Sequence, residues 1–274
     1  MTHPTTDNIA RPGRFTASLR ENRDLSRRYF LLVVERPSGF ETPAPGTFIH
    51  LLPPAPGRFF LRRPFSVLDC DDDTVSLLIV EKGAGTMYLR SLPKGIAIDF
   101  IGPLGNSFPP LPGRRVLAIG GGVGLAPLYL YRSALDASAR GAFRLLYGAR
   151  TKEDLFVDRF EWRFPDVGFA TDDGSHGFAG SVVDLAAREM KTASYDAIFS
   201  CGPVPMIVAA EKLARKTGTR HFVSLENRMG CGMGACRSCV VTVREAGAEK
   251  YKTVCHDGPV FDAADLVWEK LPAV

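Results

Sequence analysis

The apolar residues of the first part of the chain fall in short runs that turn residues separate. These runs cover residues 29–34, 47–52, 59–68, 75–81 and 96–101, and the gaps between them are rich in Pro, Gly, Ser and Asp. Runs of strand length bounded by such residues are typical of antiparallel β structure. The pattern predicts a small antiparallel β-barrel over residues 12–110.

The pattern changes from Arg114 onward, where apolar runs of strand length alternate with segments long enough for helices. The runs cover residues 116–119, 143–147, 167–170, 197–200 and 221–225. Alternation of this kind predicts a parallel sheet with helices on its faces. We therefore expect an α/β domain over residues 111–226, which the Pro-rich stretch 108–113 links to the barrel.

The remaining stretch, residues 227–274, is too short to build a strong core without a metal or a cross-link. It holds four of the six cysteines in the order C-x4-C-x2-C followed by a distant fourth: Cys231, Cys236, Cys239 and Cys255. This spacing is that of plant-type ferredoxin clusters. We expect these four thiolates to hold a 2Fe-2S cluster in a small C-terminal module.

Small residues surround the first two of these cysteines: Gly230, Gly232, Gly234 and Ala235. They leave room for backbone N–H groups to approach bridging sulfides, and glycine tolerates positive φ. A four-cysteine zinc site is the alternative, although zinc ribbons usually pair two C-x2-C units and only one occurs here. The two isolated cysteines, Cys70 and Cys201, are expected to stay without a metal.

Composition narrows the class of protein. With 45% apolar and 23% charged residues, the 274-residue chain is typical of a globular protein, and its net charge of +4 is scattered along the sequence. Nothing in this distribution calls for nucleic acid as a partner. The N-terminal segment shows no basic start followed by an apolar run, so we expect no secretory signal and a cytoplasmic protein. The longest apolar stretch, residues 116–131, is interrupted by glycines and a proline, so no membrane span is expected.

A glycine-rich turn joins the apolar run 116–119 to the helix-like segment 128–135. Its residues are Gly120, Gly121, Gly122, Val123 and Gly124. A turn of this kind lets backbone amides and a helix N-terminus approach a pyrophosphate, although by itself it also fits a close-packed turn without a ligand. Two further short segments follow strands at the edge where open parallel sheets bind ligands: Asp172-Asp173 and Cys201-Gly202-Pro203.

The barrel carries a signal of its own in Arg63-Pro64-Phe65-Ser66 and in residues 81–86, which precede the helix-like segment 87–92. An arginine can neutralise a phosphate, Ser66 can hydrogen-bond a ring edge, and Gly85-Thr86 can present N–H groups. An ordinary edge strand bearing Pro and Arg is the alternative interpretation.

Taken in order, these motifs resemble the ferredoxin-NADP reductase superfamily, and more closely the electron-transfer subunits of type B dihydroorotate dehydrogenases. The likeness covers nearly all of residues 14–270, and stretches 225–236 and 254–261 are the most specific. The resemblance implies FAD bound by Arg63, Pro64, Phe65, Ser66, Val80, Glu81, Lys82, Gly85 and Thr86. It implies a nicotinamide dinucleotide bound by Gly120, Gly121, Gly122, Val123, Gly124, Asp172, Asp173, Cys201, Gly202 and Pro203.

The resemblance also implies a role and a partner. Electrons would pass from NAD(P)H through FAD and the cluster to an FMN-containing dihydroorotate dehydrogenase catalytic subunit of pyrimidine biosynthesis, in a heterotetramer. Two alternatives stay open: an NAD(P)H-dependent flavin and iron-sulfur reductase subunit of another redox complex, and a zinc-bearing interaction module. The choice between NADH and NADPH stays open as well, because Arg150 and Lys152 could meet a 2′-phosphate or face solvent.

Electron transfer of this kind needs placement rather than a general acid or base. The five histidines, His3, His50, His176, His221 and His256, show no pairing pattern in the sequence, so we expect surface or satisfied core residues. Five apolar residues after the last cysteine are expected to form a contact surface for the partner, with packing against the rest of the chain as the alternative: Val260, Phe261, Leu266, Val267 and Trp268.

Overall fold

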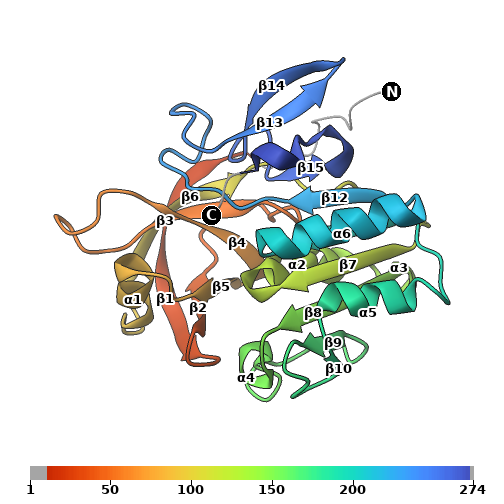
Figure 1. Cartoon of the computed structure of the whole chain (residues 1–274). Helices are drawn as coiled ribbons and strands as arrows, with labels where there is room; N and C mark the ends of the chain where they lie inside the picture. The colour runs from red at the N-terminus through yellow and green to blue at the C-terminus, as the bar shows by residue number, and fades with distance from the viewer. Residues whose placement is uncertain (1–10, 272–274) are drawn as a thin grey trace.

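The computed structural model describes residues 11–271 of the chain. The N-terminal segment used for the localisation argument, His3, and residues 272–274 of the expected cluster module lie outside the described residues. A barrel, a sheet flanked by helices and a C-terminal hairpin lie side by side, with the hairpin above the other two in Figure 1. Within residues 11–271, no helix is long and apolar enough to cross a membrane.

Six antiparallel strands close into a barrel in the order β1-β2-β5-β4-β3-β6. They are β1 (Gly13–Asp24), β2 (Tyr29–Glu35), β3 (Phe48–Leu52), β4 (Arg63–Cys70), β5 (Thr74–Val80) and β6 (Ala97–Leu104). The predicted barrel is confirmed, and β1 is a strand that the apolar runs did not reveal. Helix α1 (Ala84–Arg90) packs against the barrel core through Leu89.

Strand β3 separates two environments, because successive side chains of a strand point to opposite faces. Ile49 and Leu51 belong to the barrel core, whereas Phe48 packs in the cluster of apolar residues that includes Cys239 and Cys255. One face of β3 therefore builds the barrel and the other faces the cysteine module.

The second sheet has seven strands in the order β10-β9-β8-β7-β11-β12-β15. They are β7 (Val116–Gly121), β8 (Phe143–Ala149), β9 (Gly168–Thr171), β10 (Phe178–Ala179), β11 (Ala197–Cys201), β12 (Arg220–Ser224) and β15 (Val260–Asp262). All neighbours are parallel except β15, which pairs antiparallel with β12. The predicted parallel sheet is confirmed, and the C-terminal region extends it by one antiparallel strand.

Helices cover both faces of this sheet (Figure 1). Helices α5 (Val182–Glu189) and α6 (Val204–Thr217) lie on one face, while α2 (Leu125–Ala134) lies on the face toward the barrel; α3 (Ala137–Arg140) and α4 (Lys152–Leu155) are single turns. All residues of α2 from Leu125 to Arg132 are buried, and Leu130 belongs to the barrel core. A helix that is apolar on all sides must lie between two layers, so α2 joins the barrel to the sheet.

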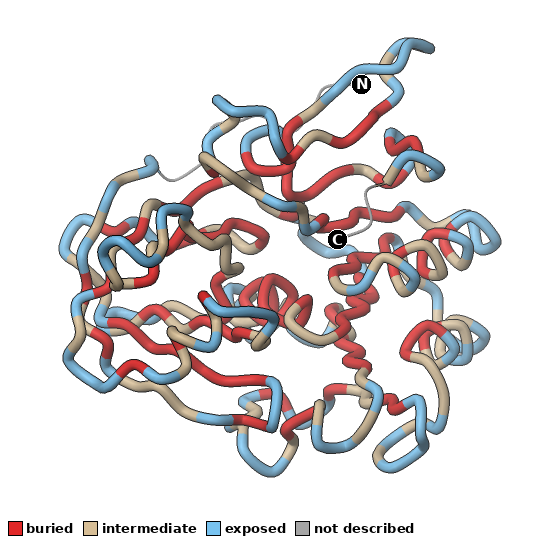
Figure 2. The backbone as a smooth tube through the Cα atoms, turned by 60° about the vertical axis from the view of Figure 1, so that its left-hand side comes forward, coloured by how far each residue is buried: buried red, intermediate tan, exposed pale blue. Residues whose placement is uncertain are grey.

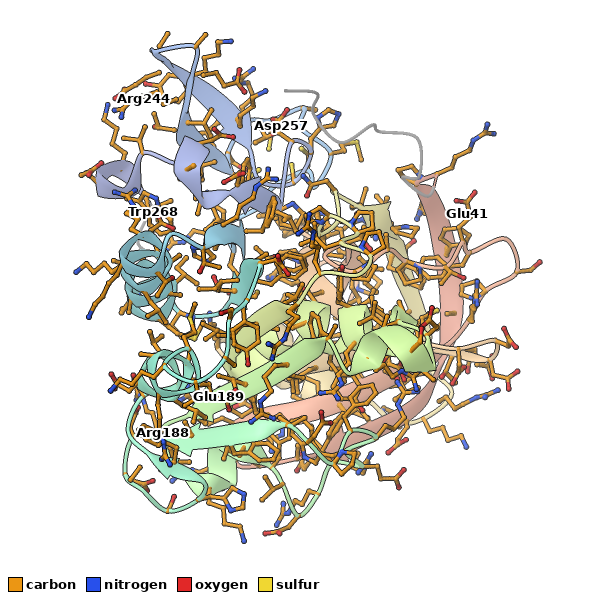
Figure 3. The ribbon with its side chains drawn as sticks, turned by 90° about the vertical axis from the view of Figure 1, so that its right-hand side faces the viewer. Glu41, Arg188, Glu189, Arg244, Asp257 and Trp268 are labelled. Atoms are coloured by element: carbon orange, nitrogen blue, oxygen red, sulfur yellow. The ribbon has the colours of Figure 1, made fainter. Side chains whose placement is uncertain are left out.

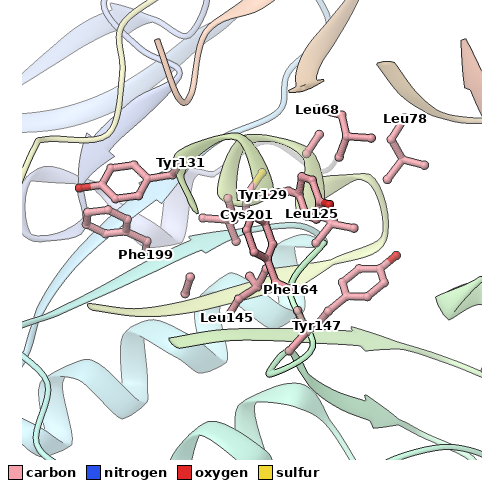
Figure 4. Packing of buried hydrophobic residues seen from close by; sticks show 14 of the residues in the cluster. Leu68, Leu78, Leu125, Tyr129, Tyr131, Leu145, Tyr147, Phe164, Phe199 and Cys201 are labelled. Carbon is pink, nitrogen blue, oxygen red and sulfur yellow. The ribbon is translucent and has the colours of Figure 1, made fainter. Parts of the chain in front are cut away.

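The linker between barrel and sheet is part of the core. Phe108 is 2% exposed and stacks on Phe199 of β11 at a centroid distance of 4.6 Å, and Tyr131 of α2 meets Phe199 edge-on at 5.1 Å. Figure 4 shows Tyr131 and Phe199 in this buried layer, with Cys201 further along it beside Leu125. The two domains are therefore packed against each other rather than loosely tethered.

The C-terminal module contains the hairpin β13 (Val240–Glu245) and β14 (Ala248–Thr253), β15 and two short 3-10 turns, η2 (Ala263–Asp265) and η3 (Trp268–Lys270). Asn106 holds it to the linker region: its Nδ2 donates to the carbonyls of Asp257 and Val260, each at 2.9 Å, and its Oδ1 accepts from the Val260 N–H at 2.8 Å. The module is thus fixed by residues that are distant in sequence.

The expected partner-contact surface after Cys255 is wrong for four of its five residues, and the fifth, Trp268, is half-buried and stacks on His221. Val260, Phe261, Leu266 and Val267 are only 5–8% exposed and pack within this chain, as the buried stretches of the tail in Figure 2 show. They pack inward because β15 pairs with β12 and brings the tail over the sheet and the hairpin.

Candidate functional site

A cavity of about 440 Å³ lies where barrel, sheet and C-terminal segment meet. This volume is within the range of ~300–1,000 Å³ that is usual for small-molecule sites. Ten of the cofactor residues expected from the sequence line it: Arg63, Pro64, Phe65, Ser66, Val80, Lys82, Gly85, Thr86, Val123 and Cys201.

The barrel wall of the cavity is built by β4 and by the loop that enters α1. A Cβ at Gly85 would lie 3.1 Å from Arg63 Nε, so the glycine lets the guanidinium lie directly against the backbone. Thr86 Oγ1 accepts hydrogen bonds from the backbone N–H groups of Lys82 (2.9 Å) and Gly83 (3.1 Å), which orders the loop. The wall thus offers a fixed cation and ordered backbone to an anionic group. Glu81 does not line the cavity, and its carboxylate pairs with Arg90 at 3.2 Å.

The sheet wall is formed by two turns in backbone contact. A Cβ at Gly124 would lie 2.6 Å from the Gly202 nitrogen and still closer to the Cys201 carbonyl, and one at Gly121 would lie 3.0 Å from Pro203 Cδ. Of this group only Val123 and Cys201 reach the cavity lining, while Gly120, Gly121, Gly122, Gly124, Gly202 and Pro203 stand behind or beside it. Complete burial raises the pKa of the Cys201 thiol far above its ordinary value, so this side chain stays neutral.

Asp172 and Asp173 follow β9 at the same edge of the sheet but do not line the cavity. Asp173 Oδ1 accepts hydrogen bonds from the N–H (3.0 Å) and Oγ (2.6 Å) of Ser175, and the Asp173 N–H donates to the Arg150 carbonyl at 3.2 Å. Lys152 pairs with Asp158 at 2.8 Å. Lys152 is therefore already engaged with a carboxylate.

A third wall was missed by the sequence interpretation. It consists of Phe48, Pro259 and the segment from Ser224 to Met229, which leaves β12 and leads toward Cys231. The signal was present, because the segment follows the carboxyl end of a parallel strand, where such sheets bind ligands. Glu226 lies in this wall with Oε2 3.9 Å from Lys82 Nζ; although its side chain is 40% exposed, burial among the cavity walls raises its pKa.

Backbone N–H groups surround the sulfur atoms of the cysteine loop. The N–H groups of Met233 and Cys236 point to Cys231 Sγ at 3.5 and 3.4 Å, and that of Gly234 points to Cys255 Sγ at 3.1 Å. A hydrogen bond with Ser238 lowers the pKa of Cys236 to about 6, whereas burial raises the pKa of Cys255.

Two glycines of this loop have positive φ and leave no room for a side chain. Gly232 (φ +76°) and Gly234 (φ +85°) would each bring a Cβ within about 3 Å of a histidine, His50 and His256 respectively. Within residues 11–271, no group of three or more His, Cys, Asp or Glu side chains is arranged to hold a single metal ion. The fit of an iron-sulfur cluster therefore rests on the loop itself, where amide donors, small residues and thiols combine as such a group requires.

Tertiary packing gives two histidines environments that the sequence did not reveal. His221 is a satisfied core residue, as expected, because its Nε2 lies 2.7 Å from Ser200 Oγ and its Nδ1 lies 2.8 Å from Glu211 Oε2. Trp268 stacks on the His221 ring and lies between the C-terminal module and α6 in Figure 3. His50 contradicts the expectation, since it is 0% exposed and neither ring nitrogen has a partner at full hydrogen-bond geometry among the described residues, although the backbone of Cys231 lies within reach of the ring.

Comparison with known proteins agrees with this arrangement. Residues 226–267 match the family described as the iron-sulfur cluster binding domain of dihydroorotate dehydrogenase B. The chain is 36% identical over 261 residues to the electron transfer subunit of dihydroorotate dehydrogenase B (NAD(+)) from Shouchella clausii, covering 93% of this chain and 98% of that protein. It is 37% identical over 262 residues to the corresponding subunit from Bacillus caldolyticus, covering 93% and 99%.

A solved structure is also similar over most of its length. The structure of an NADH-dependent reduced ferredoxin-NADP oxidoreductase, described for flavin-based electron bifurcation, superposes with a TM-score of 0.79 at 29% identity. The superposition covers 92% of this chain and 90% of the other. Barrel, sheet and cysteine module therefore occur together in a known redox protein.

Proposed function

Since the chain belongs to the family of electron transfer subunits of dihydroorotate dehydrogenase B, we propose that its cavity and its four clustered cysteines hold two redox groups between which electrons pass. As a member of this family it is an NADH-dependent oxidoreductase subunit that passes electrons to the catalytic subunit in pyrimidine biosynthesis. It has the FAD-binding fold and the iron-sulfur binding domain that this role requires.

In this proposal FAD occupies the cavity. Its ring and phosphates are held by Arg63, Pro64, Phe65, Ser66, Val80, Lys82, Gly85 and Thr86, with Glu81 keeping the loop in place through Arg90. The Arg63 guanidinium, lying against the Gly85 backbone, supplies a positive charge for a phosphate. The apolar faces of Phe48 and Leu78 supply the rest of the lining.

The nicotinamide dinucleotide binds along the carboxyl edge of the sheet, at Gly120 to Gly124, Asp172, Asp173 and the Cys201-Gly202-Pro203 turn. The support is positional: all three segments follow parallel strands at the edge where such sheets bind ligands, and two of them reach the cavity. The related subunits are named for NAD(+), which agrees with NADH as the donor.

The cluster held by Cys231, Cys236, Cys239 and Cys255 is proposed to be of the 2Fe-2S type. The C-x4-C-x2-C spacing and the amide N–H groups that point at Cys231 and Cys255 support this choice. The domain limits 12–110, 111–226 and 227–274 belong to the same proposal.

One observation carries the proposal more than any other. The segment Ser224–Met229 lines the cavity and continues within two residues to Cys231, so the flavin site and the cluster site share a wall. Two redox groups placed there would be neighbours without any rearrangement of the chain.

The chain's own residues then have positioning tasks. When bound, FAD accepts a hydride and releases single electrons, which is the conversion that an iron-sulfur acceptor needs. Cys201, buried and neutral, presents an uncharged side chain to the cavity between the sheet turns and the barrel wall.

The acceptor in this proposal is an FMN-containing catalytic subunit, assembled with this chain in a heterotetramer. Apolar side chains stay exposed on the β3–β4 loop, on α1 and in the cysteine loop: Phe60 (84%), Leu61 (58%), Met87 (56%) and Met233 (49%). They replace the buried tail residues as the apolar surface available to a partner.

The test is to measure flavin, iron and zinc in the purified protein and then its electron acceptors. We expect FAD and iron, NADH-dependent reduction of an artificial acceptor by the chain alone, and orotate reduction only after the catalytic subunit from the same source is added. Zinc without iron would favour the interaction module. Iron and FAD without coupling to that subunit would favour a reductase subunit of another redox complex.

A further inference from the structure

His50 is a buried side chain that has no role in the proposed function described above. Its side chain is 0% exposed, and neither ring nitrogen has a partner at full hydrogen-bond geometry among the described residues. Burial lowers the pKa of the ring, while the backbone of Cys231 lies close enough to oppose this shift through a hydrogen bond. Buried polar groups are almost always paired, and leaving one unpaired costs about 1–3 kcal/mol. The backbone of Cys231 is therefore a partner within reach that would satisfy the ring.

The position of His50 on β3 places it beside the proposed flavin site. Phe48 pairs with Ser66 and His50 pairs with Pro64 across the β3–β4 ladder. Phe48, Pro64 and Ser66 all line the cavity. Because alternate residues of a strand share a face, His50 lies on the same outer face of the barrel as these three residues.

The other side of His50 touches the cluster loop. A Cβ at Gly232 would lie 3.0 Å from His50 Cγ and 3.1 Å from Cε1, and Nδ1 is nearer still. Gly232 directly follows Cys231 and has φ +76°. The first turn of the cluster loop thus lies against the edge of the imidazole, with no side chain between them.

We propose that His50 is a positioning residue that fixes the cluster loop to the FAD-binding barrel, through a hydrogen bond between its imidazole and the backbone of the Cys231–Gly232 turn. The ring is a polar side chain that touches this turn from the barrel strand next to the cavity wall. Its hydrogen bond sets the place of the cluster beside the flavin and its electrostatic surroundings, and so its reduction potential.

This inference rests on the proposed function, because it needs the cluster to be present. The experiment compares the full-length protein with His50→Leu, which removes both ring nitrogens, and with His50→Asn, which keeps a hydrogen-bonding amide near the place of Nδ1. The matched control is His256→Asn, because His256 also lies against the cluster loop, at Gly234, but its side chain is 70% exposed. Iron and FAD per chain, the electron paramagnetic resonance spectrum of the reduced protein and the midpoint potential of the cluster are measured for each.

We expect His50→Leu to keep FAD but either to lose iron or to shift the cluster potential by the equivalent of a tenfold change in the reduced-to-oxidised ratio, about 59 mV for one electron. His50→Asn should recover at least half of that change, and His256→Asn should match the wild type. An identical spectrum and potential in His50→Leu and wild type would overturn the inference. Equal loss of iron from both His50 variants would also overturn it, since ring volume alone would then hold the loop. Wild-type protein without iron would instead refute the proposed function.

Discussion

The contact between the glycine-rich turn and the Cys201-Gly202 turn makes a sharp test of how the sheet wall is built. Gly124 has φ −63°, so an alanine there meets no backbone strain of its own. Its Cβ, however, would lie 2.6 Å from the Gly202 nitrogen and closer to the Cys201 carbonyl, where ordinary contact begins at 3.4 Å. Both neighbours are backbone atoms, so one of the two turns has to shift by nearly an ångström to make room for the added methyl group.

The expected size of the effect follows from this displacement. Overpacking of this kind costs about 1–3 kcal/mol, which corresponds to a fall in Tm of roughly 3–10 °C for a chain of this size. A misplacement near 1 Å between reacting groups lowers rates by about 10²-fold. We therefore expect Gly124→Ala to lose most of its NADH-dependent reduction of an artificial acceptor.

Thermal unfolding and steady-state kinetics with NADH measure the two effects. The matched control is Gly141→Ala, because Gly141 has φ −65° and no atom within 4 Å of its Cβ position. That variant should keep both its Tm and its activity. If Gly124→Ala behaves like Gly141→Ala, the close packing of the two turns does not determine the geometry of the site.

Three further predictions concern single side chains. Cys236→Ser should lose iron while FAD stays bound, because the cavity walls do not include this residue. Metal and flavin analysis measures both, and the control Cys70→Ser should keep both. Loss of flavin together with iron would contradict the separation of the two sites. Arg63→Ala should weaken FAD binding by about 1.5–3 kcal/mol, the scale of a charge-assisted hydrogen bond. The control Arg20→Ala, on the barrel surface beside Glu35, should leave FAD affinity unchanged. An unchanged affinity in Arg63→Ala would make that residue an ordinary edge-strand arginine. Burial raises the pKa of Glu226 from its usual 4.5, so the folded state favours the protonated carboxyl. The stability that the protonated side chain contributes is present at low pH and is lost as pH rises through the folded-state pKa. Glu226→Gln should therefore raise Tm at pH 7 more than at pH 4, and an equal change at both pH values would refute this account.

Local chemistry was readable from the sequence. The spacing of the four clustered cysteines and the small residues between them are typical of iron-sulfur binding. The glycine-rich turn after residues 116–119 is typical of a turn that lies close to a bound dinucleotide. The fold class was readable for a similar reason, because strand-length apolar runs differ in spacing between the barrel and the parallel sheet.

The limits of that interpretation lie where segments distant in sequence meet. Asn106 binds the carbonyls of Asp257 and Val260, 151 and 154 residues away. The spacing of apolar and polar residues along the chain does not predict a contact over such a distance. The same contact holds Val260 at the start of β15, and the pairing of β15 with β12 buries the tail residues that an apolar count alone assigns to a partner.

The candidate site shows the same division. Its barrel and sheet motifs were predicted one by one, but only packing brings Arg63, Cys201 and Glu226 to one cavity and leaves Asp173 outside it. His50 is the clearest case, because in the sequence it is one histidine in an apolar strand. The closure of the barrel and the docking of the cysteine loop decide that it is buried between the cavity wall and that loop, since burial is set by which surfaces meet and not by the residues on either side in the chain.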